Sequence, residues 1–138
     1  MNLFRTMLAI TAFAFSASAA AFDHTHAAWD ALLKKHVKVI DGGKASQVRY
    51  ADFAKDRAAL KAYLAEVSKV TPAEFAGWPK AGRMAFLVNA YNAYTVELIL
   101  TKYPDLKSIR DLGNIVFNSP WKQKFFTLFG EPYWLDRI

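Results

Sequence analysis

The amino-acid sequence predicts an α+β fold that is mainly helical, with a buried central helix and a C-terminal aromatic β-hairpin. Three observations lead to this prediction. Several segments repeat apolar residues at helical spacing, and one long segment is apolar on nearly every face. The last part of the chain changes to short aromatic runs around a glycine. No repeat or linker interrupts residues 22–138, so we expect them to form a single domain.

Residues 1–21 have the composition of a secretory signal peptide. Arg5 supplies a positive charge, an apolar run extends from Met7 to Phe15, and Ala17-Ser18-Ala19 offers an A-x-A cleavage site, with Ala19-Ala20-Ala21 as a second option. The apolar run is much shorter than the roughly 20 residues that a membrane-spanning helix needs. We therefore expect cleavage at one of the two sites, a periplasmic or secreted location, and no transmembrane anchor.

Charge and cysteine content restrict the partners and the means of stabilisation. The formal net charge is +6, which becomes +5 when Arg5 is removed, and the basic residues are dispersed over 34–38, 55–61 and 122–124. Dispersed lysines usually form a solvated face, so we expect no nucleic-acid partner, while weak association with an anionic envelope surface stays open. The chain has no cysteine, so packing alone must stabilise it.

The first two helices are predicted from amphipathic spacing. The first covers residues 23–41, with Asp23 or Thr25 as the N-cap and Gly42-Gly43 ending it. A short extended stretch at 48–53 then leads into a second helix over about Ala51 to Val67.

A start signal at Thr71, Pro72 and Glu74 predicts a short third helix that ends near Trp78. The long central helix follows, from near Lys80 to about Tyr103, where Pro104 disfavours helical geometry in the residue before it. Because nearly every face of this segment is apolar, we expect the helix to be buried.

The C-terminal part is predicted to be less regular. Residues 105–121 are expected to form a loop that is broken by Gly113 and Pro120, with a short helical turn around Ser108 to Leu112. Two short aromatic strands then flank a tight turn at Gly130-Glu131, with glycine as its first residue. An isolated hairpin is marginal in water, so this one must dock on the helices or on further strands.

Two asparagines, Asn89 and Asn92, interrupt the most apolar run, and on a helical wheel they share one apolar stripe. A buried amide without a partner costs roughly 1 to 3 kcal/mol. They are therefore interpreted either as ties between the helix and neighbouring backbone or as the wall of a pocket, with Tyr91 between them as a further binding candidate. Asparagine cannot act as a base, so the catalytic residues, if any, are unknown.

The histidines give no strong site. His36 adjoins the apolar face of the first helix and is interpreted as a core or boundary residue. His24 and His26 flank Thr25, and cleavage after Ala21 would leave His24 third in the chain, where a free amine and imidazole could chelate copper or nickel. Dedicated sites normally need three or four fixed ligands, and no phosphate-loop, dinucleotide or hydrolase motif occurs, so we expect no metal and no cofactor.

One segment carries a family resemblance. Residues Phe86, Asn89, Ala90, Tyr91, Asn92 and Ala93 form an F-x-x-N-A-Y-N-A motif. Tyr103-Pro104, Ser108-Ile109, Trp121 and Gly130 follow it. From about Val48 to Ile138 the chain resembles the N-terminal part of the bacterial family catalogued as domain of unknown function 547.

This resemblance implies a partial domain with no assigned biochemical activity. In the family, the pattern continues past a leucine-aspartate-x-isoleucine step, matched here by Leu135, Asp136 and Ile138, into a segment with a histidine and cysteines. Two hypotheses result. The chain is an exported envelope protein in which Asn89 and Asn92 organise a core or pocket wall. Alternatively, it belongs to a hydrolase- or transferase-like enzyme whose catalytic histidine and cysteine lie beyond Ile138.

Overall fold

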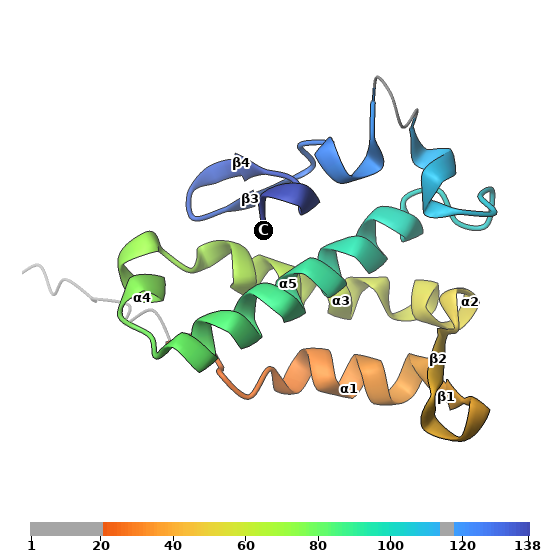
Figure 1. The fold of residues 1–138 in the computed structure, drawn as a ribbon, viewed down its shortest axis with the longest axis horizontal. Helices are drawn as coiled ribbons and strands as arrows, with labels where there is room; N and C mark the ends of the chain where they lie inside the picture. Colours follow the sequence, from red (N-terminus) through yellow and green to blue (C-terminus); the bar gives the residue numbers. More distant parts are fainter. Residues whose placement is uncertain (1–20, 114–117) are drawn as a thin grey trace, which may run out of the picture.

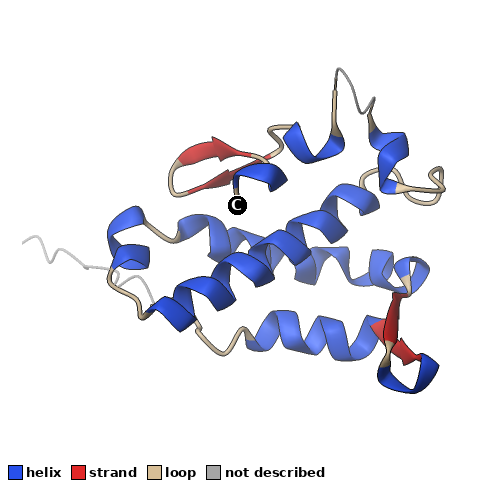
Figure 2. Cartoon of the chain, in the orientation of Figure 1, coloured by secondary structure: helices blue, strands red, loops and turns tan. Residues whose placement is uncertain are grey.

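Three helices run side by side in the computed structural model, which describes residues 21–113 and 118–138 (Figures 1 and 2). They are α1 (Ala27–His36), α3 (Arg57–Lys69) and α5 (Lys80–Leu100), and α3 packs against both of the others. Two small antiparallel hairpins complete the fold, so the mainly helical α+β prediction is confirmed. The predicted signal peptide falls almost wholly on residues 1–20, outside the described residues.

The first helix is shorter than predicted. It ends at His36, and β1 (Val37–Ile40) pairs with β2 (Ala45–Val48) in an antiparallel hairpin. The β-branched residues of β1 favour extended backbone, and three positive φ angles at residues 41–43 allow the chain to reverse within a few residues. Asp23 stabilises the approach to α1, because its carboxylate accepts the backbone N–H of Ala27 at 3.0 Å.

The predicted second helix is divided. Its parts are α2 (Tyr50–Phe53), a 3₁₀ turn (Ala54–Asp56) and α3, with Asp56 in a non-helical conformation. The Asp56 carboxylate contacts His36 Nε2 at 2.7 Å, so a contact with α1 holds the break in place. The cap at Thr71 is confirmed: its Oγ1 accepts the N–H of Glu74 at 3.1 Å and starts α4 (Pro72–Ala76).

Helix α5 forms the centre of the core, as predicted, but its burial is one-sided. Seven of its residues are buried, in a core that also holds Leu60, Leu64 and Val67 of α3. Met84 and Val88 on another face are 56% and 51% exposed. The helix also ends at Leu100 rather than Tyr103, and turns lead from there to Pro104.

A partly buried ion pair joins α3 to α5. Arg57 Nη2 lies 2.8 Å from Glu97 Oε1, and Arg57 Nε lies 3.1 Å from Oε2. Such a two-point contact fixes the relative rotation of the two helices as well as their separation.

The C-terminal hairpin docks on the helices, which confirms one of the two predicted modes. Its strands are β3 (Phe126–Leu128) and β4 (Glu131–Tyr133). Leu128 is fully buried, and the Phe126 ring stacks on Tyr94 of α5 with centroids 3.7 Å apart. The turn differs from the prediction: Phe129 and Gly130 both have positive φ, 54° and 77°, so glycine is the second turn residue, as in a type I′ turn.

Short 3₁₀ turns complete the C-terminal part: Ile109–Leu112, Pro120–Lys122 and Leu135–Arg137. The first is the helical turn predicted around Ser108 to Leu112, where Ser108 Oγ accepts the N–H of Arg110 and the Asp111 carboxylate accepts that of Ser108.

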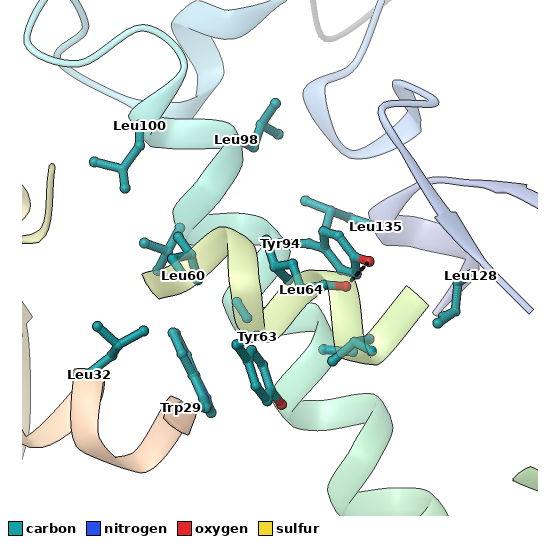
Figure 3. Packing of buried hydrophobic residues seen from close by; sticks show 14 of the residues in the cluster. Trp29, Leu32, Leu60, Tyr63, Leu64, Tyr94, Leu98, Leu100, Leu128 and Leu135 are labelled. Atoms are coloured by element: carbon teal, nitrogen blue, oxygen red, sulfur yellow. Dashed lines mark hydrogen bonds between the residues drawn. The ribbon is translucent and has the colours of Figure 1, made fainter. Parts of the chain in front are cut away.

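One continuous core connects all these parts (Figure 3). It extends from Trp29 on α1 to Leu135 beyond the hairpin. At one end, aromatic rings from four separate stretches of chain meet: Phe22, Phe75, Trp78, Phe86 and Phe129. Among the helices of the described ranges, none is long and apolar enough to cross a membrane.

Candidate functional site

The asparagine motif on α5 has two faces with different surroundings. Phe86, Ala90 and Ala93 are fully buried in the core. Asn89 is half-buried, and Asn92 is exposed. The expectation that both amides lie in a buried stripe is therefore wrong for Asn92. The physical reason is that α3 and the hairpin cover only part of α5, so an apolar stripe on a helical wheel is not necessarily a covered one.

The exposed side of the motif borders a shallow cavity of about 390 Å³, which we name the α5 groove. Apolar side chains dominate the lining, and Asn92 is the only amide in it. The lining residues are Met84, Leu87, Val88, Tyr91, Asn92 and Ile138. The structure thus brings two of the three predicted site residues, Tyr91 and Asn92, to one surface, and it places Asn89 outside that surface.

Neither asparagine ties α5 to a neighbouring element within the described residues. The side-chain hydrogen bonds of this helix come instead from Tyr94, Thr95 and Glu97. An exposed amide has water as a partner and carries no desolvation cost. Of the two interpretations of Asn92, the pocket wall agrees with the geometry and the core tie does not.

His36 is a core residue, as predicted. It is 1% exposed, its ring stacks on Phe53 with centroids 4.6 Å apart, and its Nε2 contacts the Asp56 carboxylate. Lys35 Nζ lies 2.6 Å from the same carboxylate. These two hydrogen bonds, first that of Lys35 and then that of His36, lower the pKa of Asp56. The arrangement joins α1 to the segment before α3, so His36 and Asp56 have a structural role.

Sequence reasoning missed a second buried histidine contact, between His26 and Tyr63. His26, for which no burial was predicted, is only 6% exposed, and its Nδ1 shares a hydrogen bond of 2.8 Å with Tyr63 Oη on α3. Burial lowers the pKa of His26 and raises that of Tyr63. The available signal was local: Asp23 accepts three hydrogen bonds from Thr25 and Ala27, and that turn directs His26 inward.

The histidines do not assemble a metal centre in the part of the chain that the structure describes, where no group of three or more metal-binding side chains occurs. His24 packs against the ring of Trp78, with centroids 4.5 Å apart, while His26 faces Tyr63. Both rings also contact Phe22, with centroids 5.8 Å and 5.3 Å from it, so the two histidines share one aromatic neighbour.

A comparison with known proteins finds no matching family model, no similar curated protein and no similar solved structure.

Proposed function

We propose that this chain is an exported bacterial envelope protein, resembling domain of unknown function 547, which binds a polypeptide segment in the α5 groove. The observation that carries the binding proposal is the exposure of Asn92 beside Met84 and Val88 on one face of α5. Two large apolar side chains more than half exposed on one helical face, with a hydrogen-bonding group next to them, have the composition of a contact surface.

The chemistry of the groove favours a polypeptide over a charged small molecule. The Asn92 amide offers both a donor and an acceptor, which is the pairing that a backbone peptide group requires. Met84 has a flexible thioether side chain that adapts its shape to an apolar partner. None of the side chains that line the groove is charged. A segment with apolar side chains and one accessible peptide group matches this lining.

The proposals of export and of family membership rest on the amino-acid sequence. The charged start, apolar run and alanine-rich cleavage region of residues 1–21 support a periplasmic or secreted location. The F-x-x-N-A-Y-N-A motif supports the family proposal. The residues of this motif divide between two environments: Phe86, Ala90 and Ala93 pack into the core, while Asn92 faces the groove. The dispersed positive charge supports a weak additional association with anionic envelope surfaces.

Site-specific photocrosslinking in the native host tests the groove. The photoreactive residue p-benzoylphenylalanine replaces Val88 in one variant and Val39 in a matched control, since Val39 is also an exposed valine but lies on β1. We expect a polypeptide adduct from position 88 and none from position 39. Adding Asn92→Arg to the first variant should abolish the adduct, because a long charged side chain would fill the groove.

The mass of the adduct identifies the occupant as a second copy, another protein or a segment of the same polypeptide. Equal yields from positions 88 and 39, or no adduct from position 88, would refute the groove as a polypeptide site.

A further inference from the structure

A second cavity, of about 400 Å³, lies between the segment that precedes α1 and the middle of α3. It shares no lining residue with the α5 groove. Its walls combine small side chains with aromatic rings, namely Ala28, Ala59, Ala62, Phe22, His26 and Tyr63. This volume falls within the usual range for small-molecule sites, about 300 to 1,000 Å³.

The alanines determine the shape of the cavity. Ala59 and Ala62 lie on exposed turns of α3, and Ala28 faces them from α1, so no long side chain fills the space between the two helices. Tyr63 is held in place at the base, because its ring stacks on Trp29 with centroids 5.9 Å apart (Figure 3) and its hydroxyl bonds to His26. A flat apolar group can therefore enter without displacing a protein side chain, and it meets a fixed aromatic surface.

The charged side chains that line the cavity are acidic. Asp23 and Glu66 are the two carboxylates in its lining, on a chain whose net charge is +6. Hydrogen bonds from Thr25 and Ala27 hold the Asp23 carboxylate in place and lower its pKa, so it stays ionised. Glu66 pairs with Lys69, but both side chains of that pair are more than half exposed, so water and ligands compete for it.

We propose that this cavity binds a small aromatic ligand that carries a positive charge. The ring lies over Ala59 and Ala62 against Tyr63, and the cationic group lies near Asp23 and Glu66. The apolar lining supplies the affinity for the ring, and the carboxylates select the charge. The uncharged imidazole of His26 adds no repulsion toward the cation.

Three indole compounds test the proposal because they share one ring and differ in charge: tryptamine, tryptophol and indole-3-acetate. Each is titrated into the purified chain while amide signals are followed by NMR. We expect saturable shifts at Ala28, Ala59 and Ala62. Tryptamine should bind about fivefold more tightly than tryptophol, since one charge contact near the surface contributes about 1 kcal/mol, and indole-3-acetate should bind least. Equal binding of all three would overturn the charge selection.

Substitutions on one helix locate the site. Ala62→Phe fills the cavity and should weaken tryptamine binding at least tenfold, whereas Ala65→Phe, at an exposed alanine of α3 outside the lining, should leave it unchanged. Glu66→Gln should weaken the binding of tryptamine and not that of tryptophol. Because positions 62, 65 and 66 are exposed, the variants should fold, which their dispersed amide spectra verify. Unchanged tryptamine binding by Ala62→Phe would overturn the site.

Discussion

Phe86 and Asn92 belong to the same motif on the same helix, yet the structure gives them opposite surroundings. Phe86 is fully buried among aromatic rings, while Asn92 faces solvent at the α5 groove. The residue types alone suggested an internal hydrogen-bonding role for the amide. Whether a polar residue on an apolar helix is buried depends on how many elements cover that helix, which periodicity does not report.

Substitution of these two residues should separate stability from surface chemistry. Asn92→Ala should change the free energy of unfolding by less than about 0.5 kcal/mol, because the amide is exposed. Phe86→Ala should cost about 3 to 5 kcal/mol, because it leaves a cavity in the core. Urea unfolding followed by circular dichroism measures both. A cost above about 2 kcal/mol for Asn92→Ala would restore the interpretation of this residue as a core tie.

His26 predicts a specific pH dependence. Burial, the largest influence, lowers its pKa below the ordinary 6.5 of the unfolded chain; Asp23 opposes this shift and His24 adds to it. Between the two pKa values the unfolded chain binds more protons, so the free energy of unfolding falls as pH decreases from about 6.5 through the lower, folded-state value. The melting temperature should therefore decrease between about pH 7.5 and about pH 5.

The matched control for this pH effect is His26→Asn, because asparagine also tolerates the positive φ of 52° at this position but does not titrate. The variant should melt at a lower temperature overall, since the bond to Tyr63 is lost, and it should show a smaller decrease between the two pH values. An equal decrease in both proteins would assign the effect to other groups.

At the scale of elements, local signals were predictable and tertiary ones were not. The predicted cap at Thr71 and the predicted turn at Ser108 depend on side chains within three residues of the helix or turn start, and the structure has both. The end of α1 at His36 and the break at Asp56 depend on each other through a contact between distant segments. The sequence pattern continues as a helix through both places, so it could not predict either boundary.

The docking of the C-terminal hairpin predicts that two neighbouring residues of β3 contribute very differently to the free energy of unfolding. Leu128→Ala should cost about 2 to 5 kcal/mol, because Leu128 is fully buried. Thr127→Ala should change the free energy of unfolding by less than about 0.5 kcal/mol, since the neighbouring Thr127 side chain is exposed on the same strand. Thermal or chemical unfolding measures the difference. Similar small effects for both would mean that the hairpin does not complete the core in solution.

At the scale of the whole molecule, the fold class was predictable and the sites only in part. Amphipathic periods and the aromatic tail sufficed for a helical α+β fold. Tyr91 and Asn92 were proposed from their residue types, but the exposure of Asn92 and the position of both beside the α5 groove were not predicted. The cavity beside His26 could not be predicted, because it forms only when α1 and α3 pack together, and no local pattern relates His26 to Tyr63.

The proposed export makes a prediction for the whole chain in its native host. The purified protein should begin at Ala20 or Phe22, as determined by mass spectrometry of its N-terminal peptide. Ala19→Phe should block processing, because Ala19 is the last residue of one A-x-A site and the first residue of the other. Met7→Leu keeps the apolar run and should be processed normally. A native protein that retains Met1 would contradict the proposal.

The docked hairpin also has a kinetic consequence. Helices α3 and α5 lie close together in the sequence, so their pairing closes only a short loop. Leu128 and Phe129, by contrast, reach Phe75 and the helices over a much longer stretch of chain. Closing that larger loop costs more conformational entropy before any contact compensates it. The helices are therefore expected to associate early. Water is excluded from the core only in the last step, when the hairpin packs against the helices.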